Sequence, residues 1–188
     1  MHQYNIGFDL IDAFLKSMEM DLEETSHDRV NYDSYIYGSA EVVGLMCLNV
    51  FVGVNQKKHN ELRDSAKMLG SAFQKVNFLR DIKSDLEQRS RIYLPGVHDK
   101  IFISNANKQK LETEIDKEFH EAFKGIKKLP IGVKLGVYSA YLYYLMLFKK
   151  IKQMDVKKLM STRVRISNPY KLFLLVKCYL EVKVLKMT

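Results

Sequence analysis

A polar stripe along one otherwise apolar helix constrains this chain more than any other feature. Asn77, Asp81 and Asp85 follow one another at intervals of four residues. On a helix with 3.6 residues per turn they share one face, and Gly70 and Gln74 extend that face toward the N-terminus. The remaining circumference carries apolar side chains: Leu69, Phe73, Val76, Phe78, Leu79, Ile82 and Leu86. Such a helix is expected to be buried, with its polar stripe facing an interior cavity.

The stripe has the chemistry of a metal site. Two carboxylates at i and i+4 repel each other, at a cost of about 0.2–0.5 kcal/mol, and a divalent cation removes that conflict. Mg²⁺ prefers oxygen ligands and typically uses one or two carboxylates together with the oxygens of a bound phosphate. A solvated acidic surface is the ordinary alternative, but the apolar surroundings and the neighbouring Arg80 disfavour it. We predict that Asn77, Asp81 and Asp85 bind Mg²⁺, with Mn²⁺ as the alternative metal, beside a diphosphate.

Apolar residues recur at helical spacing through the rest of the chain. We predict helices over residues 7–25, 35–54, 61–87, 108–127, 132–154 and 169–187. The polar stretch 26–33 is expected to separate the first two, Asn60 to cap the third, and residues 91–95 to be extended. No segment alternates with period two for long enough to indicate a sheet. The sequence therefore predicts one all-α domain over residues 1–188.

Positive charge is concentrated at the C-terminal end. The net charge is +8, and residues 149–188 hold eleven Lys or Arg against Asp155 and Glu181, a local balance of +9. A basic end can serve an anionic membrane, a nucleic acid or a diphosphate. For most of these lysines a solvated surface is the simplest interpretation.

Several features favour a cytoplasmic protein. The N-terminus lacks the basic and apolar regions of a signal peptide. Cys47 and Cys178 lie in apolar helical contexts and are expected to be buried thiols rather than a disulfide. The uncharged run at residues 135–148 is short for a membrane span and typical of a buried helix.

The motifs together resemble one family. The segment NFLRDIKSDLEQRSRIYLP resembles the second aspartate-rich motif of squalene and phytoene synthases. YIYGSAEVVGLMCL, at residues 35–48, resembles the Y-x-Y-x-x-A-x-x-V-G helix of that family, and LKSMEMDL resembles the segment before it. YYLMLFKKIKQMD and STRVRISNPYKL are similar to the closing helices of bacterial phytoene synthases. The resemblance covers nearly all of the chain in the right order.

This resemblance implies the isoprenoid-synthase fold, a helical bundle around a central cavity. It also implies catalytic roles for Tyr35, Asp81 and Asp85. An aromatic ring such as that of Tyr35 can stabilise a nearby carbocation. The predicted substrate-binding residues are Gly70, Gln74, Asn77, Arg80, Tyr144 and Arg163.

The implied reaction is the head-to-head condensation of two prenyl diphosphates. Phytoene synthesis from geranylgeranyl diphosphate, in carotenoid biosynthesis, is favoured. Squalene or diapophytoene synthesis is the alternative, because prenyl chain length depends on the depth of the cavity.

One departure from the family pattern limits the functional claim. The family carries a first aspartate-rich motif before the Y-x-Y segment, whereas the D-x-x-x-D spacing occurs here only at Asp81 and Asp85. Glu19 and Glu23 have the same spacing but stand later than that motif would. We expect the chain to correspond to the C-terminal two-thirds of such a synthase. Three explanations stay open: a shortened gene model, a split enzyme in which a separate chain supplies the first motif, and a degenerate paralogue.

Two other functions stay open at this stage. The chain could be a non-catalytic module that binds a prenyl diphosphate or acts as a scaffold. A nucleic-acid-binding role rests on the basic end alone, so we expect no nucleic-acid partner. Because prenyl substrates are lipid-like, we expect peripheral membrane contact instead.

Overall fold

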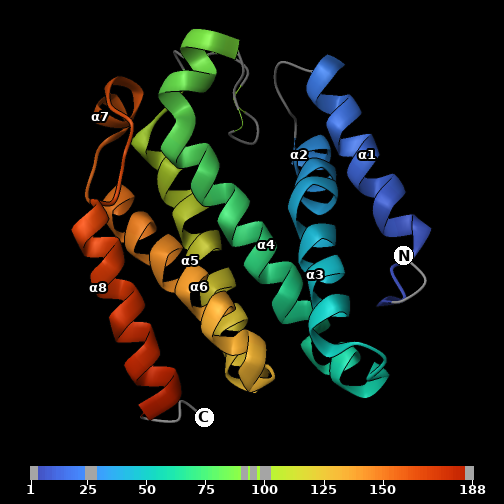
Figure 1. Cartoon of the computed structure of the whole chain (residues 1–188). Helices are drawn as coiled ribbons and strands as arrows, with labels where there is room; N and C mark the ends of the chain where they lie inside the picture. Colours follow the sequence, from blue (N-terminus) through green and yellow to red (C-terminus); the bar gives the residue numbers. More distant parts are fainter. Residues whose placement is uncertain (1–3, 24–28, 90–92, 94–96, 98–102, 185–188) are drawn as a thin grey trace.

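The computed structural model describes residues 4–23, 29–89, 93, 97 and 103–184, and every regular element among them is helical (Figure 1). The elements are α1 (Phe8–Glu23), α2 (Arg29–Ile36), η2 (Tyr37–Glu41), α3 (Val42–Val52), α4 (Gln56–Ser84), η3 (Asp85–Arg89), α5 (Asn105–Lys128), α6 (Ile131–Lys152), α7 (Val156–Ser161), α8 (Asn168–Tyr179) and η5 (Leu180–Val184). The segments η2, η3 and η5 are single π-helical turns. The predicted all-α class is confirmed.

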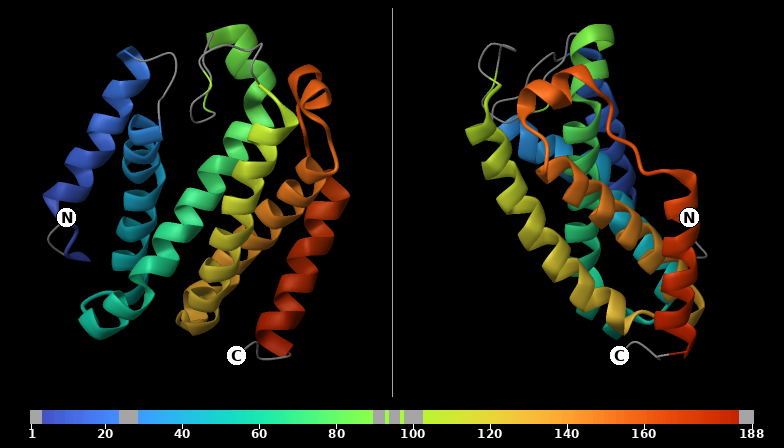
Figure 2. Two further views of the ribbon diagram at one scale, coloured as in Figure 1. Left: turned by 180° about the vertical axis from the view of Figure 1, so that it is seen from behind. Right: turned by 90° about the vertical axis from the view of Figure 1, so that its left-hand side faces the viewer.

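Helix α4 lies at the middle of the bundle, and α1 and α8 lie at opposite edges (Figures 1 and 2). It packs against η2 and α3 on one side and against α5, α6 and α7 on the other. Its apolar residues Val76, Leu79 and Ile82 are buried. The helix predicted to carry the polar stripe is therefore the central one.

The predicted start of the second helix is wrong. Residues 29–52 form one nearly continuous helical segment, made of α2, η2 and α3, whereas we expected the polar stretch to run to residue 33. Arg29 forms ion pairs with Asp33 and with Glu114 of α5, and Tyr32 is fully buried. Polar residues can lie within a helix when another helix supplies their partners, and this explains why residues 29–33 are helical. Residues 24–28 lie outside the described part of the chain.

Other helix boundaries also differ from the prediction. The cap of α4 is Asn55 rather than Asn60, since the Asn55 side chain accepts a hydrogen bond from the backbone N–H of Lys58 at 3.0 Å. Gly53, with a φ of 57°, ends α3 in a conformation that favours glycine. Helix α7 was not predicted, because six residues are too few for a clear apolar period. Of the predicted extended segment 91–95, the structure describes Tyr93 alone.

A buried ionic cluster joins α4 to α5. The ammonium of Lys75 lies 2.5 Å from Glu118 Oε1 and 3.1 Å from Glu114 Oε2, and Ser71 donates a hydrogen bond to Glu118 at 2.8 Å. Burial raises the pKa of the Glu118 carboxyl. Removing one partner would leave a buried charge unpaired, so the cluster fixes the two helices in register.

Glycines mark the points where α4 comes closest to the segment before it. A Cβ on Gly70 would overlap the backbone oxygen of Ala40, and a Cβ on Gly44 would overlap that of Ala66. Gly136 of α6 differs, because a Cβ there would meet nothing within 4 Å. The first two glycines are needed for close helix packing, and Gly136 is not.

We predict opposite effects on stability for two glycine-to-alanine variants. Gly70→Ala should lower the free energy of unfolding by about 1–3 kcal/mol, because the backbones must separate. Gly136→Ala, the matched control, should raise it by about 0.5–1 kcal/mol, since alanine favours a helix. Urea unfolding followed by circular dichroism measures both. Equal effects of the two variants would contradict the close crossing.

Candidate functional site

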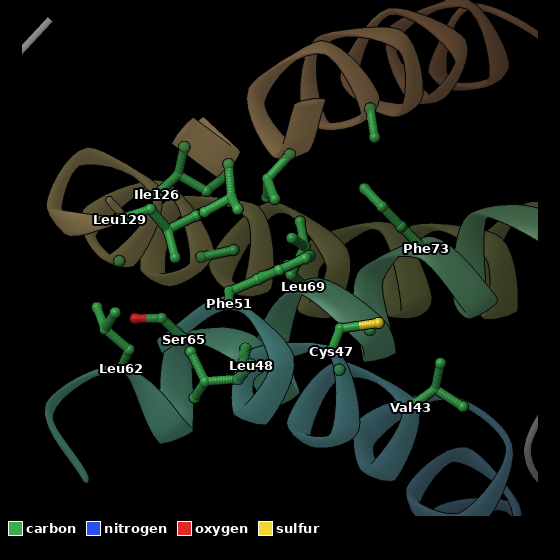
Figure 3. Close-up of a pocket in the computed structure, with 18 of the residues that line it drawn as sticks. Val43, Cys47, Leu48, Phe51, Leu62, Ser65, Leu69, Phe73, Ile126 and Leu129 are labelled. Carbon is green, nitrogen blue, oxygen red and sulfur yellow. The ribbon is translucent and has the colours of Figure 1, made fainter. Parts of the chain in front are cut away.

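An apolar pocket of about 610 Å³ lies between η2, α3, α4, α5 and α6 (Figure 3). Polar side chains enter its lining at four positions: Ser39, Cys47, Ser65 and Gln74. Within the described part of the chain, no charged side chain lines it. The predicted central cavity is therefore present, and it suits a hydrocarbon chain.

The pocket leads along α4 toward the polar stripe. Gly70 and Gln74, both predicted to bind substrate, belong to its lining. Asn77 follows Gln74 by about one turn, and Asp81 follows by another. The Asp85 backbone N–H donates to the Asp81 carbonyl, so the spacing of four residues persists into η3. Oxygen ligands thus stand beyond one end of an apolar pocket.

Arg80 and Arg163, both predicted to bind substrate, contact the carboxylate of Asp81. The Arg80 Nε lies 3.0 and 3.1 Å from the two carboxylate oxygens of Asp81, and a second guanidinium nitrogen donates a hydrogen bond to Asp81 Oδ2. Arg163, in the connection between α7 and α8, places its Nε 3.1 Å from Asp81 Oδ1. The hydrogen bond to Asp81 raises the pKa of Arg80. The structure therefore brings Arg163 to the stripe from a distant part of the sequence.

Tyr144 also reaches the stripe. Its hydroxyl donates a hydrogen bond to Asn77 Oδ1 at 3.3 Å. Its ring stacks on Phe73, a pocket residue, with centroids 4.0 Å apart. Tyr144 thus connects α6 to the boundary between the apolar pocket and the polar stripe.

Tyr35 has a different environment. It is almost fully buried and, among the described residues, it is not part of the pocket lining. Its hydroxyl donates to Asp21 Oδ2 at 2.9 Å, and Tyr93 donates to the other oxygen of Asp21 at 2.7 Å. Burial first, and the charge of Asp21 second, raise the pKa of Tyr35. The hydroxyl is therefore protonated at neutral pH, and its catalytic role stays a prediction.

Asp21 and Tyr93 were missed as site residues by the sequence reasoning. Both stand in segments that resemble family motifs, LKSMEMDL and RIYLP, and this was the available signal.

The expectation for one cysteine was wrong. Cys47 is exposed at the pocket, whereas Cys178 is buried as expected. Partial burial raises the pKa of the Cys47 thiol, so it is mostly protonated at neutral pH.

The donor set fits Mg²⁺ only in part. The described residues contain no cluster of three or more His, Cys, Asp or Glu able to hold a metal by themselves. Asn77, Asp81 and Asp85 offer amide and carboxylate oxygens, which are the ligands that Mg²⁺ prefers. Mg²⁺ also accepts oxygens from a phosphate. The three residues therefore fit a metal that a diphosphate helps to bind, and this assignment stays a prediction.

The all-α bundle around an apolar pocket, with carboxylates and arginines beyond one end, agrees with the isoprenoid-synthase fold that the sequence resemblance implies. The sequence model of the family described as squalene/phytoene synthase matches residues 1–98. The chain belongs to the squalene/phytoene synthase family.

Individual relatives agree with this assignment. A bifunctional lycopene cyclase/phytoene synthase of Blakeslea trispora is 30% identical over 163 residues, covering 77% of this chain and 27% of the relative. A 15-cis-phytoene synthase of Pantoea ananas is 28% identical over 184 residues, covering 90% of this chain and 56% of the relative. The chain thus spans less than two-thirds of the length of these curated relatives.

Solved structures show the same fold. A dehydrosqualene synthase in complex with ligand superposes with a TM-score of 0.71 at 21% identity, covering 94% of this chain and 65% of that one. YisP from Bacillus subtilis superposes with a TM-score of 0.72 at 18% identity, covering 93% of this chain and 73% of that one.

We predict that Asp21 stabilises the protein by accepting hydrogen bonds from the hydroxyls of Tyr35 and Tyr93. Asp21→Ala should lower the free energy of unfolding by about 1–3 kcal/mol, because buried hydroxyls lose their acceptor. The double variant Asp21→Ala, Tyr35→Phe should lose less unfolding free energy than the sum of the losses of the two single variants. Asp12→Ala, an exposed position on the same helix, is the control. Equal losses for the Asp21 and Asp12 variants would contradict the prediction.

Proposed function

We propose that this chain forms the prenyl-diphosphate-binding part of a head-to-head prenyltransferase. One observation carries the proposal: along α4 an apolar pocket extends as far as Gln74, and about two turns further on Arg80 and Arg163 converge on Asp81. The pocket suits the hydrocarbon, and guanidinium groups bind phosphate oxygens in pairs. Membership of the squalene/phytoene synthase family supports the same reaction class.

The residues of this chain would act on the substrate in distinct ways. Arg80 and Arg163 bind diphosphate oxygens and offset the charge that grows on the leaving group. The apolar pocket keeps water away from the prenyl chain, which protects a carbocation from hydrolysis. Tyr144 orients Asn77 through its hydrogen bond. When bound by Asn77, Asp81 and Asp85, Mg²⁺ would supply further positive charge to the diphosphate.

Geranylgeranyl diphosphate is the substrate we favour, with phytoene as product. The phytoene synthases among the relatives support this choice. Squalene-type or diapophytoene synthesis, from shorter prenyl diphosphates, is the alternative. The length of the pocket along α4 is the feature that would select between them.

We further propose that the protein acts peripherally at a membrane, where lipid-like substrates reside. Between residues 149 and 184, ten Lys or Arg stand against two acidic residues. Two helical segments, Arg29–Val52 and Ile131–Lys152, are long and apolar enough to cross a membrane by length and composition alone. Both contribute buried residues to the core and line the pocket, as helices of a bundle do.

We predict that Asp81→Ala and Asp85→Ala each abolish the Mg²⁺-dependent binding of a non-hydrolysable prenyl diphosphate analogue. The helical circular dichroism signal should stay nearly unchanged. Isothermal titration with and without Mg²⁺ measures the effect. Asp64→Ala is the matched control, since Asp64 is an exposed carboxylate on the same helix. Wild-type affinity in either stripe variant would show that the stripe is not the metal site.

We also predict that the 188-residue chain alone binds the analogue but makes no detectable phytoene from geranylgeranyl diphosphate and Mg²⁺. It offers one carboxylate stripe, whereas the resemblance implies two facing each other. Adding the N-terminal part of a related synthase, fused or as a separate chain, should restore product formation. Robust synthesis by the chain alone would contradict the need for a second motif. Binding without turnover in every combination would favour a non-catalytic binding module.

A further inference from the structure

The apolar pocket has a defined length along α4. Its lining on this helix extends from Leu62 to Gln74, which spans about 18 Å at a rise of 1.5 Å per residue. Leu62, Ile126 and Leu129 lie toward one end of the pocket (Figure 3). Phe73 lies toward the other end, where Gln74 precedes the polar stripe. A hydrocarbon chain that starts at the polar stripe would therefore extend toward Leu62.

Helix α6 runs along this pocket in the same direction as α4. At the polar end, Tyr144 of α6 donates a hydrogen bond to Asn77. At the far end, the ammonium of Lys128 in α5 lies 2.9 Å from Glu61 Oε1, and α6 begins three residues later at Ile131. These two contacts determine which residues of α6 lie level with which part of the pocket.

Two glycines of α6 line the pocket at positions where helix packing does not require them. Gly132 and Gly136 are both exposed, and a Cβ on either would meet no described atom within 4 Å. Gly70 and Gly125 line the same pocket, but a Cβ on either would come to 2.3 Å from a neighbouring atom. The space at Gly132 and Gly136 belongs to the pocket, so a larger side chain there would occupy room that a ligand could use.

The two glycines stand at distances from Tyr144 that match successive isoprene units. An extended isoprene unit contributes four carbon–carbon bonds of about 1.5 Å to the chain and spans roughly 5 Å. Gly136 lies eight residues before Tyr144, about 12 Å along the helix, and Gly132 lies twelve residues before it, about 18 Å. With the first isoprene unit beside Tyr144, the third unit lies level with Gly136 and the fourth with Gly132.

We propose that Gly136 and Gly132 determine which prenyl chain length the pocket accepts. Gly136 leaves room for the third isoprene unit, and Gly132 leaves room for the fourth. This inference rests on the proposed function, because it takes a prenyl diphosphate as the ligand, and it deepens that function by naming residues that select the substrate. A pocket with both glycines suits a chain of four units, as in geranylgeranyl diphosphate.

The test measures the affinities of geranyl, farnesyl and geranylgeranyl thiolodiphosphates by isothermal titration with Mg²⁺. Gly132→Leu should weaken binding of the geranylgeranyl analogue about tenfold or more, because the hydrophobic burial of one isoprene unit is lost. It should leave the two shorter analogues unchanged. Gly136→Leu should weaken the farnesyl and geranylgeranyl analogues to the same degree and leave the geranyl analogue unchanged.

Two control variants separate side-chain size from other effects. Gly136→Ala adds a single methyl group at the same position and should leave the order of the three affinities unchanged. Lys149→Leu adds an apolar side chain at an exposed position of α6 outside the pocket lining, and it should change none of them. The helical circular dichroism signal of every variant should match that of the wild type.

An equal loss of affinity for all three chain lengths would overturn the inference, since leucine would then disturb the pocket as a whole. Unchanged affinities in both leucine variants would also overturn it, and the proposed function would stand if Asp81→Ala still abolished binding.

A second measurement separates the pocket from the polar stripe. Geraniol, farnesol and geranylgeraniol are tested without Mg²⁺, by displacement of a fluorescent hydrophobic dye from the wild type and the two leucine variants. The same pattern of losses with the alcohols, without binding of the thiolodiphosphates, would support the role of the glycines and contradict the diphosphate site. Alcohols that bind the leucine variants as they bind the wild type would overturn the inference.

Discussion

The close crossing of α4 with the segment before it is the constraint on which the site depends. Gly70 packs against the backbone of Ala40, and Gly44 packs against that of Ala66, so the two helices run antiparallel in contact. A side chain at either glycine would push the backbones apart. Because both glycines also line the pocket, the contact fixes one of its walls. The position of the stripe relative to the pocket follows from this wall.

Helix α4 presents different chemistry on its different faces. Ser71 and Lys75 form a buried ionic cluster with α5, and the pocket side carries apolar and small residues. Asp81 stands beyond the pocket, held by Arg80 and Arg163. Buried charges need partners: Lys75 pairs with two glutamates of α5, and Asp81 pairs with Arg80 of its own helix and with Arg163 of the connection between α7 and α8. This separation keeps the pocket free of charged side chains among the described residues.

Much of the fold could be predicted because helices are local structures. The spacing of apolar residues indicated the long helices. The predicted helix ends were wrong where a capping side chain or a partner on another helix determines the end. Asn55 rather than Asn60 caps α4, and Arg29 begins its helix because Glu114 of α5 pairs with it. The short α7 depends on its Asp155 cap, which accepts from the Lys158 N–H, and not on an apolar period.

The sequence by itself determined that Asn77, Asp81 and Asp85 share one helix face, because the α-helical repeat places residues four apart side by side. It also determined the family, through motifs in their order. Only the tertiary structure decided that Arg163 reaches Asp81, that Tyr35 donates to Asp21, and that Cys47 borders the pocket. Contacts between helices depend on how closely and at what register they cross, and side-chain packing across the whole bundle sets that crossing.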